Sequence, residues 1–235
     1  MWRKRLLISI VLVFGFVALV LVGLCAMAKH EPSYYRQATL PAGPERQSLS
    51  QQATNRFLAI GTALATSQED WELTFKTEEL NAYFQEQYYD QGGDDNLPDG
   101  FSAPRVKLED GKMRVGVRYG KGSLSTILTL EIKLWLVKDE LNVLAMEIVS
   151  LQAGSLPLST GTLLDYISEA ARREYIDIAW YRHDGHPVAI MRFQSDLTRP
   201  TFQFHQFELK GGELRIVGRS TDLLAPLPPP RPVPK

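Results

Sequence analysis

Residues 105–115 read RVKLEDGKMRV, with apolar and charged side chains alternating on both sides of Asp110-Gly111. Alternation with a period of two is typical of a strand that buries one face. Asp-Gly between two such runs is a strong signal for a hairpin closed by a two-residue type I′ turn. Counting outward from this turn places Leu108 opposite Met113. The segment therefore predicts an antiparallel hairpin with one apolar face and one basic face.

Further strands are predicted on the carboxyl side of this hairpin. Within residues 124–137, every second residue from Leu128 to Leu136 is aliphatic, with polar residues or Trp between them. This pattern is typical of an antiparallel strand with one face buried. Shorter runs predict strands at residues 141–151, 188–193, 202–209 and 214–217. Gly-Gly at positions 211 and 212 predicts the turn of the last hairpin.

Apolar residues recur with the period of a helix in three other segments. The first helix is predicted to begin at Ser48, a favoured cap residue. A short strand at residues 71–75 leads into the second helix, which Thr77 caps, and the third is capped by Ser159 or Thr160. This order of elements predicts an α+β fold, in which a mainly antiparallel, curved sheet packs against two or three helices.

The amino-terminal segment predicts a transmembrane anchor. Residues 3–5 are basic, and an uncharged apolar run follows at residues 6–28. A helix of about 20 apolar residues crosses the hydrocarbon core of a bilayer, which is about 30 Å thick. Because basic residues are retained on the cytoplasmic side, residues 1–5 are predicted to be cytoplasmic. The main domain is then extracytoplasmic, either periplasmic or extracellular.

Two alternatives to an uncleaved anchor stay open. Ala26-Met27-Ala28 has the form of a signal-peptidase site, although the apolar run is longer than that of a typical signal peptide. Cys25 invites a lipoprotein interpretation, but Leu24 precedes it where such sequences need Gly or Ala. Cys25 is also the single cysteine of the chain, so the domain beyond the anchor can form no disulfide and no thiolate metal site.

Composition divides the rest of the chain into three parts. Residues 29–47 are polar and lack an apolar period, which predicts a spacer. Residues 48–222 form one predicted α+β domain, and residues 223–235 are a proline-rich tail expected to be an extended polyproline segment. The formal net charge is −1, so no overall field favours nucleic acid, and we predict no nucleic-acid partner.

Two segments resemble a known family. The run LTFKTEELNAY, residues 73–83, is similar to the strand, Thr-capped helix and Leu-Asn pair of YpmS-like membrane-anchored extracytoplasmic proteins of unknown function. GSLPL at residues 154–158, with the strand before it and the helix after it, resembles the Gly-x-Leu-Pro corner of the same family. The resemblance implies an anchored outer domain with a curved sheet around helices, comparable to folds that hold lipid. It carries over no catalytic residue.

The chain carries no signature of an enzyme. It has no Gly-x-Ser-x-Gly elbow, phosphate-binding loop or dinucleotide fingerprint, so no catalytic residue and no cofactor is predicted. His183 and His186, with Asp177 and Asp196 nearby, could together hold a divalent metal. Because Gly185 places the two histidines in a turn rather than on one helix face, we predict no metal site. A metal-dependent enzyme stays an alternative.

The basic face of the predicted hairpin is the first candidate binding site. Lys107 lies opposite Arg114 in the predicted register, and Arg118 lies on the same side. Like charges placed opposite each other destabilise a strand pair. Either Glu131, on the outward face of the next strand, neutralises them, or an external anion does. Such an anion would be a lipid headgroup or an anionic polymer of the cell envelope.

A group of aromatic residues is the second candidate site. Trp71, Phe75, Tyr83 and Phe84 fall within the short strand and the second helix. Their spacing is that of residues in a hydrophobic core. The same side chains could line a pocket for an acyl chain, and the two interpretations are compatible.

These patterns predict a membrane-anchored extracytoplasmic binding module without catalytic activity. Its predicted ligand is a membrane lipid or another hydrophobic component of the cell envelope. The alternative is a structural or assembly protein that docks onto another envelope protein through a sheet edge or the proline-rich tail. A lipid-binding protein should leave an apolar cavity between helices and sheet, whereas a scaffold should have a filled interior and an exposed apolar patch.

Overall fold

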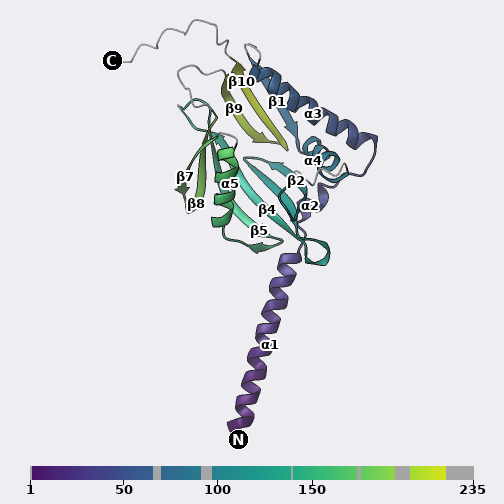
Figure 1. Ribbon diagram of the computed structural model, residues 1–235, viewed down its shortest axis with the longest axis vertical. Coiled ribbons are helices and arrows are strands. Elements are labelled where there is room, and N and C mark those ends of the chain that lie inside the picture. Colours follow the sequence, from purple (N-terminus) through teal and green to yellow (C-terminus); the bar gives the residue numbers. More distant parts are fainter. Residues whose placement is uncertain are drawn as a thin grey trace, which may run out of the picture.

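The computed structural model describes residues 2–65, 70–90, 97–138, 140–173, 176–193 and 202–220. A long helix, α1 (Trp2–Lys29), projects from a domain of strands and shorter helices (Figure 1). It contributes to the one candidate membrane span found among the described residues. The apolar segment of that span is not buried against the domain. The predicted proline-rich tail, residues 223–235, and the candidate metal ligand Asp196 lie outside the described residues.

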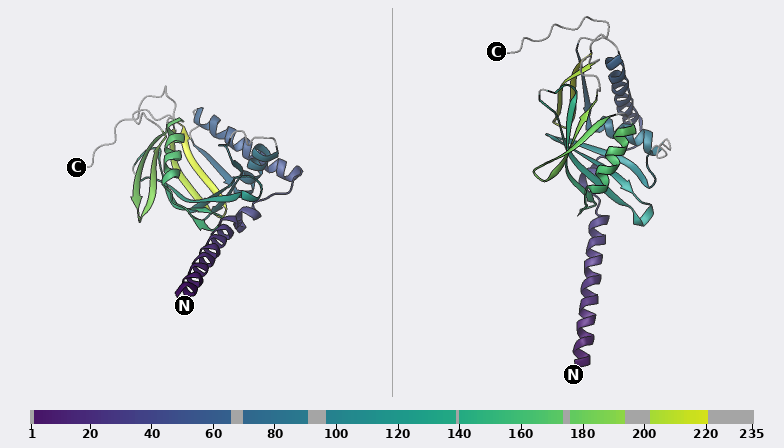
Figure 2. Two further views of the ribbon diagram at one scale, coloured as in Figure 1. Left: turned by 60° about the horizontal axis from the view of Figure 1, so that its bottom comes forward. Right: turned by 60° about the vertical axis from the view of Figure 1, so that its left-hand side comes forward.

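The strands of the domain form two antiparallel sheets. Their bounds are β1 (Trp71–Lys76), β2 (Phe101–Glu109), β3 (Lys112–Tyr119), β4 (Thr126–Leu136), β5 (Val143–Ala153), β6 (Leu156–Pro157), β7 (Asp177–His183), β8 (His186–Arg192), β9 (Phe202–Lys210) and β10 (Glu213–Ser220). The smaller sheet has the order β1-β10-β9, and the larger one has the order β2-β3-β4-β5-β8-β7, with β6 paired to β5. The larger sheet is curved (Figure 2). The predicted α+β fold class is confirmed.

The remaining helices pack beside the sheets. They are α2 (Ser33–Gln37), α3 (Pro44–Ala65), α4 (Thr77–Gln85), the π-helical turn η1 (Glu86–Asp90), the 3-10 turn η3 (Gly122–Leu124) and α5 (Gly161–Arg173). α3 and α4 lie against each other and against β1, and α4 also contacts β2. α5 contacts β7, at the opposite edge of the larger sheet from β2.

Two helices begin a few residues away from their predicted starts. α3 begins at Pro44 rather than Ser48, because proline has a fixed φ and no N–H and therefore suits the first turn of a helix. α4 begins with Thr77 itself rather than after it. Lys76 precedes the helix, and its backbone N–H donates to Glu79 Oε2 at 3.1 Å.

The central hairpin has the predicted register but a different turn. Leu108 pairs with Met113, as counting from the turn predicts. Of the two turn residues only Gly111 has a positive φ, of +71°, whereas a type I′ turn requires a positive φ at both positions. Asp110 Oδ1 accepts a hydrogen bond of 2.7 Å from the backbone N–H of Gly211, in the turn of the last hairpin. We attribute the different turn to this contact between the two hairpin tips.

The segment predicted as a spacer is part of the domain. Residues 29–47 contain α2 and the start of α3, and both tyrosines of α2 are buried. The Tyr34 hydroxyl lies 3.0 Å from Thr129 Oγ1, and the Tyr35 hydroxyl donates to the Ala103 carbonyl at 2.6 Å. The structure differs from the prediction here because two adjacent aromatic residues produce no apolar period along the chain.

The main hydrophobic core lies between the β2–β3 hairpin, α4 and the smaller sheet. Its buried members are Phe75, Leu80, Val106, Leu108 and Leu209. α3 covers this core from outside, where the rings of Phe57 and Phe75 lie 5.0 Å apart. The core therefore joins both sheets into one domain.

Candidate functional site

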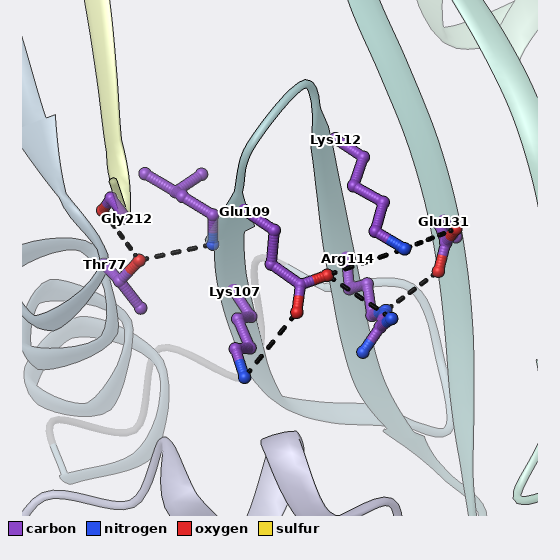
Figure 3. Close-up of polar contacts among 8 residues, drawn as sticks. Thr77, Lys107, Glu109, Lys112, Arg114, Glu131 and Gly212 are labelled. Carbon is purple, nitrogen blue, oxygen red and sulfur yellow. Dashed lines mark hydrogen bonds and ion pairs between the residues drawn. The ribbon is translucent and has the colours of Figure 1, made fainter. Parts of the chain in front are cut away.

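The basic face of the β2–β3 hairpin carries its own counter-charges (Figure 3). Arg114 Nε donates to Glu131 Oε2 at 2.8 Å, and Lys112 Nζ donates to the other oxygen of that carboxylate at 3.2 Å. Glu109 Oε1 lies 3.6 Å from Lys107 Nζ, and Glu109 Oε2 lies 3.3 Å from Arg114 Nη2. Of the two alternatives left open by the sequence, the pairing of Glu131 with Arg114 is present, and Glu109 pairs with Lys107.

These contacts stabilise the charged forms of both partners. Burial opposes ionisation of Glu131, but the hydrogen bonds from Arg114 and Lys112 outweigh it, so the pKa of the Glu131 carboxyl lies below its usual range. The same hydrogen bond from Arg114 raises the pKa of the Arg114 guanidinium. The ion pair therefore persists through neutral pH, and the pairing reduces the positive charge available to an external anion.

α2 covers other cations of the basic face. The guanidinium of Arg105 lies 4.6 Å from the centroid of the Tyr35 ring, and its Nη1 donates to the Tyr35 carbonyl at 2.9 Å. Arg118 lies 6.0 Å from the same ring, and Arg114 lies 5.9 Å from the ring of Tyr34. A cation–π contact stabilises by about 0.5–1 kcal/mol at an exposed site and by more when water is excluded. The basic residues therefore fasten α2 to the sheet.

Near the basic face, Thr77 at the start of α4 contacts the β2–β3 hairpin and the β9–β10 hairpin (Figure 3). The Thr77 hydroxyl donates to the Gly212 carbonyl at 2.9 Å and accepts from the backbone N–H of Leu108 at 3.2 Å. This hydroxyl, predicted to cap a helix, instead joins β2 to the β9–β10 turn.

Of the four aromatic candidates, Trp71 and Phe75 are buried, and Tyr83 and Phe84 are half-buried. Trp71 is buried, and its Nε1 donates to the Ser220 hydroxyl at 3.0 Å. Phe75 belongs to the main core, and the rings of Tyr83 and Phe84 lie 5.8 Å apart. Because the core contacts the apolar side of the β2–β3 hairpin, these rings and the basic face lie on opposite sides of it. The two predicted sets of residues do not form one site.

A third surface gathers aliphatic side chains from neighbouring strands of the larger sheet. We call it the apolar face, and its half-buried members are Val115, Val117, Leu128, Leu130, Leu134, Leu136, Met146, Leu151 and Met191. Strand register places them in lateral rows on one side of the sheet, with Val115, Leu130 and Leu151 in one such row. The basic face is on the other side, since alternate residues of a strand point to opposite faces.

Other described elements cover the apolar face in part. The smaller sheet packs on its β2–β3 end through Leu209. At the β7 end, Trp180 lies in the same lateral row as Met146, and its Nε1 donates to the Ser168 hydroxyl of α5 at 2.8 Å. Ile167, on the predicted apolar stripe of α5, is itself half-buried. The candidate site is therefore an apolar surface bordered by α5 and the smaller sheet.

A polar cleft lies beside the basic face. It has a volume of about 310 Å³, and its lining includes His30, Arg114, Glu131 and Gln152. Because Arg114 and Glu131 neutralise each other, this pair adds no net charge to the cleft. The cleft lies on the opposite side of the sheet from the apolar face.

His183 and His186 lie opposite each other beside the β7–β8 turn. His186 Nδ1 lies 2.6 Å from Glu147 Oε1. Asp177 lies at the other end of β7, 3.8 Å from Arg192. The part of the chain that the structure describes contains no group of three or more potential metal-ligating side chains.

Comparisons with protein-family models, with curated proteins and with solved structures find no match for this chain. Alternation along β4 predicted that strand's members of the apolar face, but it indicated a buried side. The strand pattern carries no signal for how much of this face α5 and the smaller sheet cover.

Proposed function

We propose that this protein is a membrane-anchored binding module without catalytic activity. In this proposal α1 crosses the membrane, the basic residues before it stay in the cytoplasm, and the α+β domain is extracytoplasmic. The apolar face of the larger sheet then holds the acyl chain of a lipid or another hydrophobic envelope component.

The half-burial of the apolar face is the observation that supports this proposal most. Removing apolar surface from water stabilises by about 25 cal/mol for each Å². On this side Ile132, Leu144 and Ile148 are buried, but the leucines of β4 are half-buried and still have such surface to remove. Leu128 and Leu130 are two of these residues, and both lie on the long central strand β4. A hydrocarbon chain is a ligand that fits a surface of aliphatic side chains.

Two further observations agree with a lipid ligand. α1 is long and apolar enough to span a membrane, and such an anchor would hold the domain beside lipid. The segments that resemble YpmS-like proteins correspond to the β1–α4 unit and to the corner between β5 and α5. The resemblance thus covers the elements that border the core and the apolar face.

Photocrosslinking of the full chain in its native membrane tests the proposal. A photoreactive benzoylphenylalanine at Leu134 points into the apolar face, whereas the same residue at the adjacent Lys133 lies on the opposite side of β4. We expect an adduct of lipid mass at position 134 and none at 133. Equal lipid adducts at both positions, or none at either, would contradict the proposal.

A scaffold that docks onto another envelope protein is the second candidate, and one observation favours it. β7 is the last strand of the larger sheet, and Tyr181 on it is 58% exposed. An exposed edge strand can pair with a strand of a partner. In the same crosslinking experiment, benzoylphenylalanine at Tyr181 would then give a protein adduct, while position 134 would give no lipid adduct.

A further inference from the structure

The carboxyl end of α1 is hydrogen-bonded into the domain. The Met27 carbonyl accepts from the backbone N–H of Ser155 at 2.9 Å and from its hydroxyl at 3.2 Å. The Ala28 carbonyl accepts from the Thr126 hydroxyl. The last carbonyls of a helix lack partners within the helix. Here the start of β4 and the β5–β6 corner supply those partners.

The β5–β6 corner approaches α1 closely enough to require glycine. Gly154 has a φ of +61°, and a Cβ at this position would lie 2.6 Å from the Ala28 carbonyl oxygen and closer still to that of Met27. The backbone of α1 therefore rests directly on the corner, without a side chain between them. This contact fixes the direction in which α1 leaves the domain.

The contact also fixes how far the domain lies from the bilayer. α1 has 28 residues and is about 42 Å long at about 1.5 Å per residue, more than the bilayer core of about 30 Å. Its apolar run ends at Ala28, the residue that contacts β4. The apolar run therefore continues to the domain itself, and no flexible linker separates the two.

Two exposed loops flank the end of α1. η3 precedes β4, and Leu124 in it is 84% exposed; Leu158 follows β6 and is 39% exposed. Lys121, just before η3, is also exposed. Figure 1 shows that α1 leaves the domain from the end at which β4 begins and β5 ends. We call this set, Lys121, Leu124 and Leu158, the membrane rim.

We propose that the membrane rim is a second bilayer contact of the protein, beyond α1 itself. Leu124 and Leu158 enter the interfacial region of the outer leaflet, and Lys121 lies at the level of the lipid phosphates. Leucine side chains beside a basic residue are the chemistry that binds a membrane surface. The proposal rests on α1 as the anchor and does not depend on a ligand at the apolar face.

Depth measurement by fluorescence quenching tests this proposal on the full chain. Cys25 is replaced by Ser, and Leu124→Cys is labelled with the environment-sensitive fluorophore NBD. The protein is reconstituted in vesicles of phosphatidylcholine and phosphatidylglycerol, with or without a doxyl group on the acyl chain near the headgroup. Lys210→Cys is the matched control, because Lys210 is exposed next to the β9–β10 turn. This turn contacts the tip of the β2–β3 hairpin, at the opposite end of β3 from the start of β4.

We expect blue-shifted emission and severalfold stronger doxyl quenching at position 124 than at position 210. Equal, weak quenching at both positions would overturn the proposal. Leu124 is exposed in a loop, so its replacement should leave the fold intact. Crosslinking at Leu134 reports on the apolar face and not on the membrane rim, so failure of the membrane rim and failure of the proposed lipid site give different results.

Discussion

Asn81 shows how one buried amide can replace a neighbouring strand. Its side chain is 1% exposed, and Oδ1 accepts from the Val106 N–H at 2.9 Å. Nδ2 donates to the Val106 carbonyl at 2.7 Å and to the Thr77 carbonyl at 2.8 Å. Because β2 is an edge strand, the backbone of Val106 has no strand partner on that side, and the amide satisfies both groups. Sequence patterns treat such a residue as polar surface.

Replacing Asn81 by Ala should therefore destabilise the domain strongly. The change leaves a buried N–H and a buried C=O without partners, which costs about 2–3 kcal/mol of unfolding free energy. Asn55→Ala is the control, since Asn55 accepts one exposed hydrogen bond from Gln51, and we expect less than about 0.5 kcal/mol. Urea unfolding of the detergent-solubilised protein, followed by Trp fluorescence, measures both. Equal costs would show that the amide does not hold β2.

Glu131 should make stability depend on pH. Its folded-state pKa is lowered, so its ion pairs stabilise the fold above the unfolded pKa of about 4.5, and the effect is lost as pH falls through the folded value. Glu131→Gln should cost about 1 kcal/mol at pH 7 and nothing at a pH below both values. The exposed pair of Glu213 and Lys76, 3.7 Å apart, supplies the control, and Glu213→Gln should cost less than about 0.5 kcal/mol. A Glu131→Gln penalty that stays constant with pH would contradict this account.

At the scale of elements, local patterns predicted the hairpins and missed the segments held by tertiary contacts. In the β2–β3 hairpin, alternation and one Asp-Gly turn determined the pairing, including the position of Glu131 beside Arg114. α2 could not be predicted, because it is held by Tyr34 and Tyr35 against arginines distant in sequence. The half-buried state of the apolar face depends on sheet curvature and on α5, neither of which a strand pattern encodes.

Gly154 gives a prediction for the element that receives α1. Gly154→Ala introduces both an unfavourable positive φ and a clash with the Met27 and Ala28 carbonyls. Gly211→Ala is a close match, because Gly211 has a φ of +62° but open space around its Cα. Backbone strain should lower the free energy of unfolding of both variants by about 1–2 kcal/mol, but only Gly154→Ala should separate α1 from the β5–β6 corner. Hydrogen exchange at Ser155, whose amide donates to Met27, should become about tenfold faster in Gly154→Ala alone. Unchanged exchange would show that the corner does not hold α1.

At the scale of the whole molecule, the proposed topology places the two ends of the chain on opposite sides of a membrane. In cells carrying Cys25→Ser, a membrane-impermeant maleimide should label Lys210→Cys without permeabilisation. It should label Trp2→Cys only after the membrane is opened. Labelling of position 210 only after permeabilisation would contradict the proposed topology, because it would place the domain on the cytoplasmic side.

Native mass spectrometry of the full chain released from micelles tests the proposed lipid binding most directly. The unmodified protein should retain an adduct of lipid mass under activation that strips detergent. Leu130→Gln places a polar amide on the apolar face and should lose that adduct, whereas Lys133→Gln, on the opposite side of β4, should keep it. Equal retention by both variants, or a bare mass for the unmodified chain, would contradict a lipid site on the apolar face.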